Sequence, residues 1–417
     1  MALSAALRSP AIVFSLCDQT DSLSDIDRSG FICDKAGDIV IYHLLPEREP
    51  FSAFSGLAIA GHVANVMRFD AEGIVVCESS DDSWGFGPER QLILPALRGY
   101  GRIRARRHLP LWLAGPLLRC IFRPLLSRLK DGDIVWCQSQ RAFAAALAGP
   151  IHAKGAMLIY HAHNSLADRQ SLSVFKAFTP DVCVFNSEAM RQEALQFLPE
   201  LKSTYAIHNG ADETLFYPAP PMESMNNPVP VVLFVGRLHP VKGVHVLLDA
   251  MRIMLDRKVN VVCKIIGSSH SGKSKPTSYV KSLLRSNPPN VQFAGFRIQT
   301  EIAEEYRAAD IVCCPSVWQE PFGNVNIEAM ACGVPVVASR VGGIPEIAAE
   351  GGVLLVEPNS PVELADALQS LIEDKDLRTK VGAQGLRSFR RRFTWAVAFR
   401  KYQEVADNVR QGQCVKA

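Results

Sequence analysis

Short runs of β-branched and apolar residues alternate with helix-length segments along most of this chain. A first group of such runs covers residues 38–45, 73–79, 133–139, 156–163, 181–187 and 204–210. A second group covers residues 231–237, 259–267, 290–296, 310–316, 334–339 and 352–358. Near-continuous apolar strands joined by helices are typical of parallel sheets whose two faces are both buried. The pattern therefore predicts an α/β protein with two doubly wound, Rossmann-like domains that face a cleft.

A stretch rich in proline, methionine and asparagine separates the two groups of runs. It reads YPAPPMESMNNPVP over residues 217–230, a composition that holds neither a helix nor a central strand. Residues 1–37 precede the first run and show no clear period. We therefore predict five parts, which are an N-terminal extension at 1–37, a first domain at 38–218, a linker at 219–230, a second domain at 231–390 and a terminal helix with a tail at 391–417.

The composition is that of an ordinary globular protein. The chain has 417 residues, of which 48% are hydrophobic and 21% charged, and its formal net charge of +3 is too small to indicate nucleic-acid binding. No window reaches the roughly 18 consecutive apolar residues of a membrane-spanning helix. The 11 cysteines form no C-x-x-C pair, and the apolar stretch 11–17 makes a poor signal peptide. These features favour a cytoplasmic protein.

The segment VGRLHPVKG at 235–243 has the residues of an anion-binding loop. Gly236 ends a predicted strand, Arg237 follows it directly, and Lys242 stands at the start of a predicted helix. A diphosphate at this helix start would meet free backbone N–H groups and two cationic side chains. A basic turn that binds no ligand is the alternative interpretation.

A second segment, EPFGNVNIEAMACGVPVVAS at 320–339, holds two carboxylates that seven residues separate. Glu320 is predicted in the loop after a strand, and Glu328 in a helix from Asn324 to Ala331. Carboxylates in such settings accept hydrogen bonds from sugar hydroxyls, and the N–H groups at the helix start suit an anionic group. Helix capping and surface exposure are the alternative roles.

The segment GSSHSGKS at 267–274 fits the P-loop pattern and offers an alternative function, a nucleotide-binding phosphotransferase that uses Lys273. We do not favour it, because Pro276 falls in the first turns of the helix that must follow. The strand before it is also the second of its domain, whereas a phosphate loop usually opens a P-loop domain.

Several motifs in this order resemble the retaining glycosyltransferases of family 4, the glycosyl transferase group 1 type with the two-domain GT-B architecture. The resemblance covers residues 38 to about 405. It rests on VGRLHPVKG, EPFGNVNIE, AMACGVPVVAS and VGGIPEI (341–347), and on HNGADETLFYP (208–218), which is similar to the interdomain segment of the family. The segment FTWAVAFRKY (393–402) resembles the terminal helix that crosses back to the first domain.

The resemblance implies transfer of a hexose from a UDP- or GDP-sugar to a hydroxyl group, with retention of anomeric configuration. Arg237 and Lys242 would bind the donor diphosphate, Glu320 the hydroxyls of the transferred sugar, and Glu328 the ribose hydroxyls. His163, at the end of the fourth predicted strand, would lie near the donor sugar. The further donor-binding positions that the resemblance implies are Gly56, Gly236, Gly267, Phe296, Arg297, Ile298, Phe322, Gly323, Asn324 and Val325. The nucleotide sugar is a co-substrate, and no cofactor is expected.

The sequence does not indicate a metal site. Cationic side chains and helix dipoles can neutralise the leaving group without a metal. We assign His161 to the opposite face of the strand from His163 and to a structural role, and a His-x-His site lacks further ligands at a metal spacing. Asp131 and Asp133 imitate a metal-binding DxD triplet, but they precede a strand, which indicates a turn.

Two features bear on the acceptor. Leu57 stands where the family commonly has a second glycine after Gly56, which changes the loop expected to position the acceptor. Residues 98–130 contain nine basic residues and no acidic residue, interleaved with LPLWLAGPLL. Such a segment suits peripheral contact with an anionic membrane, the alternative being a solvated helix face on a leucine core.

We therefore expect a cytoplasmic enzyme, at the inner face of the membrane, that acts on a sugar or lipid-linked saccharide. Assembly of lipopolysaccharide, exopolysaccharide or glycolipid would fit such an acceptor. A GT-B nucleotide-sugar enzyme or binding protein without transferase activity is a further alternative.

Overall fold

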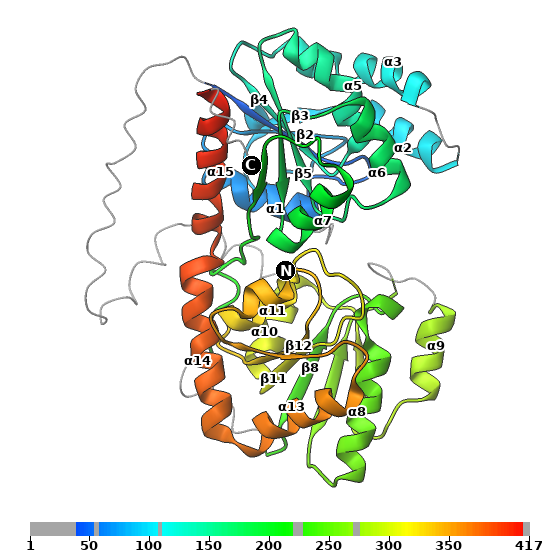
Figure 1. Ribbon diagram of the computed structural model, residues 1–417, viewed down its shortest axis with the longest axis vertical. Coiled ribbons are helices and arrows are strands. Elements are labelled where there is room, and N and C mark those ends of the chain that lie inside the picture. The colour runs from blue at the N-terminus through cyan, green and yellow to red at the C-terminus, as the bar shows by residue number, and fades with distance from the viewer. Residues whose placement is uncertain (1–38, 54–57, 107–110, 220–227, 270–275, 412–417) are drawn as a thin grey trace, which may run out of the picture. The chain divides into compact units, whose positions relative to one another are not determined.

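The computed structural model describes residues 39–53, 58–106, 111–219, 228–269 and 276–411. They form two parallel sheets, each with helices between successive strands (Figure 1). The predicted extension 1–37, Gly56, Leu57 and most of the predicted linker lie outside the described residues.

The first sheet has seven strands in the order β3-β2-β1-β4-β5-β6-β7, and all neighbouring pairs are parallel. Its strands are β1 (Ile41–Leu44), β2 (Ile74–Cys77), β3 (Gln91–Ile93), β4 (Ile134–Gln138), β5 (Met157–Ala162), β6 (Val182–Phe185) and β7 (Thr204–Ala206). The helices of this part are α1 (Ala58–Met67), η1 (Pro88–Arg90), α2 (Ala96–Arg106), α3 (Leu111–Ile121), α4 (Arg123–Leu126), α5 (Arg141–His152), α6 (Arg169–Ala177) and α7 (Glu188–Phe197).

The second sheet has six parallel strands in the order β10-β9-β8-β11-β12-β13. Its strands are β8 (Val231–Val235), β9 (Val262–Ile266), β10 (Val291–Gly295), β11 (Ile311–Cys314), β12 (Val336–Ser339) and β13 (Val353–Val356). The helices are η2 (Pro240–Lys242), α8 (Val244–Asp256), α9 (Ser278–Arg285), α10 (Gln299–Ala308), α11 (Asn324–Ala331), α12 (Ile344–Ala348), α13 (Pro361–Glu373), α14 (Lys375–Arg392) and α15 (Trp395–Arg410).

These sheets confirm the predicted α/β class. Each predicted apolar run contains one strand, whereas β3 was not predicted. This strand has only three residues and lies at the edge of its sheet, so it needs no long apolar run. With β3 counted, the run that ends at His163 is the fifth strand of the chain and not the fourth.

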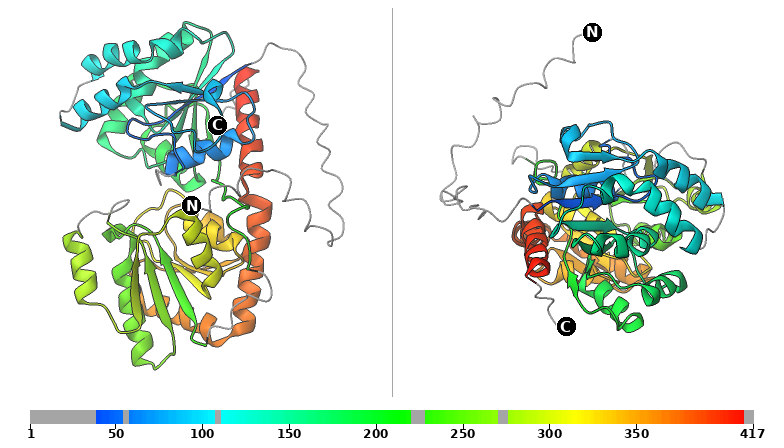
Figure 2. Two further views of the ribbon diagram at one scale, coloured as in Figure 1. Left: turned by 180° about the vertical axis from the view of Figure 1, so that it is seen from behind. Right: turned by 90° about the horizontal axis from the view of Figure 1, so that it is seen from above.

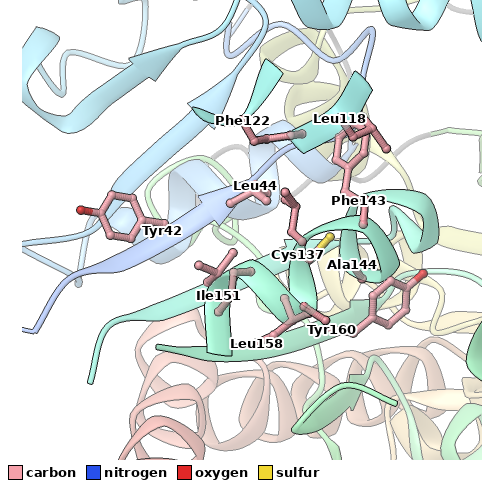
Figure 3. Packing of buried hydrophobic residues seen from close by; sticks show 14 of the residues in the cluster. Tyr42, Leu44, Leu118, Phe122, Cys137, Phe143, Ala144, Ile151, Leu158 and Tyr160 are labelled. Atoms are coloured by element: carbon pink, nitrogen blue, oxygen red, sulfur yellow. The ribbon is translucent and has the colours of Figure 1, made fainter. Parts of the chain in front are cut away.

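Buried apolar side chains explain why the strands lie inside. All five residues of β4 are buried. On one face of the first sheet, Leu44 and Cys137 pack with Phe143 and Ile151 of α5 in one cluster (Figure 3). Continuous apolar strands are thus covered by helices rather than by water, as expected for a parallel sheet.

The last helix, α15, covers the other face of the first sheet, although it follows the second sheet in the chain (Figure 2). Tyr402 packs edge-on against Trp136 of β4, with ring centroids 5.3 Å apart. The backbone N–H of Ala211 donates to the carbonyl of Phe393 over 2.9 Å, just before this helix. The C-terminal segment therefore returns to the part of the chain that precedes residue 218.

In both sheets the chain order reverses at one pair of strands. β1 pairs with β4 in the first sheet, and β8 pairs with β11 in the second. The loops that leave such a pair run to opposite sides of the sheet, and ligands of doubly wound folds bind there, at the carboxyl ends of the strands. Among the described residues, no helix is long and apolar enough to cross a membrane.

Candidate active site

The loop after β8 carries the predicted cationic residues. It runs from Gly236 through η2 to Gly243, where α8 begins. Gly243 has a φ of 70°, and a Cβ there would lie 1.7 Å from the carbonyl oxygen of Pro315. The N–H of Val317 also donates to the carbonyl of Val241 over 2.9 Å. The loops after β8 and β11 are therefore in direct contact, as the strand order requires.

An ion pair joins these two loops. Lys242 Nζ lies 2.6 Å from Glu320 Oε1, and the Ser316 hydroxyl donates to the same oxygen over 2.6 Å. Glu320 is 4% exposed, so its charge depends on these two partners. The Lys242 ammonium also lies 5.7 Å from the centre of the Trp318 ring.

Arg237 is close to Lys242 in the sequence, but its side chain forms no bond with Lys242 or Glu320. Its side chain is exposed, and within the described residues it has no ion pair or side-chain hydrogen bond. An uncompensated guanidinium is available to an anionic ligand and can hold two phosphate oxygens at once. Within the part of the chain that the structure describes, the loop after β8 thus presents Arg237 without a side-chain partner and Lys242 paired with a buried carboxylate.

The start of α11 offers backbone donors next to Glu320. Gly323 caps the helix with a φ of 102°, and the first turn, at Asn324 and Val325, has N–H groups without an acceptor inside the helix. The side chain of Asn324 accepts a hydrogen bond from Asn209 over 2.9 Å. The ring of Phe322 is 2% exposed and stacks on His208, with ring centroids 5.3 Å apart. Its ring is part of the core, and its role in donor binding stays a prediction.

Glu328 lies on α11, and the Tyr306 hydroxyl donates to its carboxylate over 2.9 Å. Burial raises the pKa of Glu328 to about 7, and the hydrogen bond from Tyr306 opposes the rise. Two hydroxyls of a ribose would supply the donors that this carboxylate lacks.

The remaining predicted residues of the second sheet lie at neighbouring strand ends. Gly267 ends β9 beside Gly236, and a Cβ on Gly267 would lie 1.8 Å from the Gly236 carbonyl oxygen. Phe296 and Ile298 project from the loop between β10 and α10, with 45% and 58% of their surfaces exposed. Arg297 lies between them and donates to the carbonyl of Phe296. These exposed apolar side chains suit the flat face of a base.

His163 lies at the end of β5, in the first sheet. Its Nε2 is 2.8 Å from Gln138 Oε1, and its Nδ1 is 3.3 Å from the Asn186 amide nitrogen. The backbone N–H of His163 donates to the Ser139 hydroxyl over 3.0 Å. Burial first, and then the neighbouring histidines, lower the pKa of His163 well below its ordinary value. The ring is therefore neutral and fixed at both nitrogens.

The orientation predicted for His161 is wrong. The rings of His161 and His163 stack with centroids 4.2 Å apart. Side chains alternate along a strand, so residues two apart share a face. His62 of α1 completes a group of three imidazoles, with its ring centroid 4.8 Å from that of His163.

Among the described residues, no direct side-chain bond joins His163 to Lys242 or Glu320. The connection runs through Asn209, which bonds Asn324 and also approaches His62 closely enough to oppose the lowering of the pKa of that histidine by burial. Asn209, which no sequence pattern selected, thus lies between the start of α11 and His62, the neighbour of His163.

The structure describes one of the two motifs that we did not favour. Asp133 accepts hydrogen bonds from the N–H groups of Val40 and Lys130, which confirms the predicted turn before β4. Helix α9 begins at Ser278, after Pro276 and with Thr277 as its cap. Residues 270–275 of the P-loop pattern lie outside the described residues.

Sequence reasoning missed the partners that hold the predicted residues. These are Ser316 beside Glu320, Gln138 and Asn186 beside His163, Asn209 beside Asn324, and Tyr306 beside Glu328. Gln138 ends β4, and Ser316 and Asn186 come within two residues of the ends of β11 and β6. Their position near the carboxyl end of a parallel strand was the feature of the sequence that could have identified these three polar residues.

The part of the chain that forms the second sheet is similar to a known family of proteins. Residues 222–387 match the family model described as glycosyl transferases group 1. The match confirms the resemblance to this type of protein, while assignment to family 4 stays a prediction.

Curated relatives match a similar portion. A D-inositol 3-phosphate glycosyltransferase of Corynebacterium kroppenstedtii is 37% identical over 193 residues, which are 45% of this chain and 42% of that protein. An alpha-maltose-1-phosphate synthase of Mycolicibacterium smegmatis is 34% identical over 234 residues, which are 52% of this chain and 60% of that protein. Spore coat protein SA of Bacillus subtilis is 34% identical over 184 residues, 43% of this chain and 47% of that protein. The chain thus spans about half the length of the relatives it matches.

Solved structures extend the similarity of fold to both sheets. Anabaena HepE in complex with UDP and glucose superposes with a TM-score of 0.69 at 22% identity, covering 89% of this chain and 100% of that one. Sucrose-phosphate synthase from Thermosynechococcus elongatus gives a TM-score of 0.69 at 19% identity, covering 89% of this chain and 99% of that one. The chain has the two-sheet GT-B fold of these glycosyltransferases.

Proposed function

We propose that this protein is a retaining glycosyltransferase that moves a hexose from a nucleoside diphosphate sugar to a hydroxyl group of a saccharide or lipid-linked saccharide. The observation that carries the proposal is the contact between the loops after β8 and β11. It places Lys242 on Glu320 and leaves Arg237 without a side-chain partner among the described residues, at the position where doubly wound sheets bind ligands.

The donor is bound by the second sheet in this proposal. Arg237 and Lys242 hold the diphosphate, with the N–H groups at the start of α11 as further donors. Glu320 accepts hydrogen bonds from hydroxyls of the sugar when Lys242 turns toward phosphate, and Glu328 accepts from the ribose. Anabaena HepE, solved with UDP and with UDP-glucose, supports a uridine nucleotide as the first donor to test.

The reaction breaks the bond between the sugar C1 and the diphosphate oxygen and forms a bond from C1 to the acceptor oxygen. The proton of the acceptor hydroxyl passes to an oxygen of the departing diphosphate. Attack from the face that the diphosphate leaves retains the anomeric configuration. Arg237 and Lys242 stabilise the charge that develops on the leaving group, so the proposal needs no metal ion at the diphosphate.

The test is a transfer assay with UDP- and GDP-sugars and an extract of saccharides and lipids from the source cells. D-inositol 3-phosphate belongs in the panel, because relatives carry it in their names. We expect transfer with one donor and a product whose anomeric proton resonance shows the donor configuration. Inversion of the configuration would contradict the mechanism, and donor binding without any transfer would favour a non-transferring protein.

We further propose that the first domain contacts anionic lipid at the inner face of a membrane. Ile103 of α2 and Leu113 and Leu117 of α3 are 46%, 46% and 39% exposed. Exposed cationic side chains on the same helices and those that follow include Arg102, Arg119 and Arg123. Apolar and basic side chains together are what an interfacial helix presents to anionic headgroups.

Co-sedimentation with vesicles tests this surface. We expect Leu117→Glu to weaken binding to vesicles containing phosphatidylglycerol by about tenfold, given about 1 kcal/mol per charged or apolar contact at the interface. Leu284→Glu is the matched control, because Leu284 is 49% exposed on α9, far along the chain. Equal binding of both variants and the unaltered protein would contradict a lipid contact at α3.

A further inference from the structure

Three imidazole rings come together in the first domain. His62 lies on α1, while His161 and His163 lie on the same face of β5. The ring centroid of His62 is 5.1 Å from that of His161 and 4.8 Å from that of His163. One ring nitrogen from each residue lies within 4.8 Å of the other two. A His-x-His pair on a strand and a third histidine from a helix therefore converge.

Hydrogen bonds fix which nitrogen of each strand histidine carries the proton. His161 Nε2 lies 2.9 Å from the Asn186 oxygen, and His163 Nε2 lies 2.8 Å from the Gln138 oxygen. An amide oxygen only accepts, so each Nε2 carries the hydrogen and each Nδ1 has a lone pair. The Asn186 amide nitrogen, which donates to His163 Nδ1 over 3.3 Å, agrees with this assignment, and an ion bound at this nitrogen would take the place of that donor.

The lone pair of His161 Nδ1 has no hydrogen-bond donor within the described residues, and His161 is fully buried. His62 Nδ1 is likewise without a partner, while its Nε2 lies 3.3 Å from the Tyr402 hydroxyl. Both histidines border a cavity that is also lined by Trp136, Gln138 and Tyr402. Buried nitrogens with an unused lone pair lack the partner that buried polar atoms usually have.

We propose that His62, His161 and His163 bind one divalent transition-metal ion of the zinc type. Three imidazole nitrogens and no carboxylate suit zinc and its neighbours, whereas Mg²⁺ and Ca²⁺ take oxygen ligands. The three rings are neutral, as ligands must be, because burial lowers each pKa. This proposal revises the expectation that no further ligand stands near the His-x-His pair.

The surroundings already have the form of an outer shell. Metal-binding histidines usually donate their other ring N–H to an oxygen, as His161 and His163 do here. Tetrahedral zinc with bonds of 2.0–2.1 Å needs nitrogens about 3.4 Å apart, so the rings must close from 4.8 Å by turning about their Cβ–Cγ bonds.

None of the three histidines lies in the loop after β8, although the resemblance places His163 near the donor sugar, and ion binding by them does not require sugar transfer. Its test begins with the full-length protein stripped of metal by a chelator and titrated with Zn²⁺ in a calorimeter and with Co²⁺ in a spectrophotometer. We expect saturation at one equivalent of either metal and visible absorption bands of nitrogen-coordinated Co²⁺. Absence of these bands in the unaltered protein overturns the proposal without any variant.

Variants then locate the bound ion. His62→Gln and His161→Asn should each weaken Zn²⁺ binding by at least 100-fold, while His152→Gln leaves it unchanged. His152 is the matched control, since it is exposed on α5 of the same domain and bonds Asp181. Unchanged Zn²⁺ affinity in folded His62→Gln, or a loss only in His152→Gln, places the ion elsewhere and overturns the proposal.

Discussion

At the scale of single residues, the site depends on a lysine and a carboxylate that compensate each other. Glu320 is almost fully buried, and its partners are Lys242 and Ser316. Removing one member of such a pair leaves an unpaired charge in the protein interior, where ions are poorly solvated. A ligand phosphate that attracts Lys242 must therefore bring hydroxyl donors for Glu320, which is what a nucleotide sugar carries.

We predict that Lys242→Ala lowers the free energy of unfolding by about 2 kcal/mol, because it leaves the Glu320 carboxylate with Ser316 alone. Transfer should fall at least 100-fold, since the diphosphate loses a cation. Urea unfolding and initial transfer rates measure the two effects. Lys242→Arg keeps the charge and should recover most of the stability. Full stability and activity in Lys242→Ala would remove the assignment of this pair.

Glu328 makes stability depend on pH. Its pKa is raised by burial to about 7, above the value of about 4.5 in an unfolded chain. The native state therefore holds the proton more tightly, so the stabilisation is complete below pH 4.5 and is lost as pH rises to 7. We predict that Glu328→Gln removes a fall of about 2–3 kcal/mol in unfolding free energy between pH 5 and 7.5. Parallel pH profiles for both proteins would contradict the raised pKa.

The sequence predicted the charged residues of this site but not the residues that hold them. Arg237, Lys242 and Glu320 lie in the connections that follow strands, and their charge makes them recognisable in the sequence. Ser316 and Asn209 are small polar residues with many possible roles, and only the fold brings them to Glu320 and Asn324. The error for His161 was of a different kind. Its spacing of two residues from His163 indicated that both side chains share a face of β5, but the alternation of side chains along a strand was applied wrongly.

At the scale of elements, the loops after β8 and β11 touch where the strand order reverses. Gly243 sits at the contact in the left-handed region, against the Pro315 carbonyl. We predict that Gly243→Ala lowers the free energy of unfolding by at least about 2 kcal/mol and weakens nucleotide binding, because the added Cβ pushes the two loops apart.

Gly149→Ala is the matched control for that prediction. Gly149 lies in α5, and a Cβ there would meet nothing within 4 Å. Alanine in a helix should raise the free energy of unfolding by about 0.5–1 kcal/mol. Equal thermal shifts for the two variants would show that the contact at Pro315 has no energetic weight.

The strands could be predicted wherever burial of both faces gave them a continuous run of apolar residues. Both sheets are parallel, so most strands are continuous apolar runs. They lack the alternation of apolar and polar residues that is easily mistaken for a loop. β3 was not predicted because an edge strand of three residues leaves one face to solvent, with Ile93 45% exposed.

At the scale of the whole molecule, Glu346 of α12 joins the two sheet-bearing parts. Its carboxylate accepts from the backbone N–H groups of Glu188 and Ala189, at 2.9 and 2.7 Å, and bonds His208 over 2.8 Å. The Ser187 hydroxyl adds a bond of 2.6 Å to the Pro321 carbonyl. Burial alone would raise the pKa of Glu346, but these hydrogen bonds outweigh it and hold the pKa below its ordinary value.

We predict that Glu346→Ala uncouples these parts, so that calorimetry shows two unfolding transitions where the unaltered protein shows one. Nucleotide affinity should change less than twofold, because the donor loops lie within the second sheet, while transfer falls about tenfold. In the unaltered protein the stabilisation by Glu346 is present above its ordinary pKa and is lost as pH falls through its lowered value. Glu357→Ala, an exposed carboxylate paired with Arg340, is the control and should leave one transition.

Calorimetric titration with UDP and GDP tests the central claim most directly, by comparing the unaltered protein with Arg237→Ala and Lys273→Ala. Arg237 lies in the loop after β8, and Lys273 in the P-loop pattern that we reject. We predict that one nucleotide binds the unaltered protein and Lys273→Ala with the same Kd, and that Arg237→Ala raises this Kd at least tenfold. Loss of binding in Lys273→Ala with an unchanged Kd in Arg237→Ala would contradict the account, as would binding of neither nucleotide.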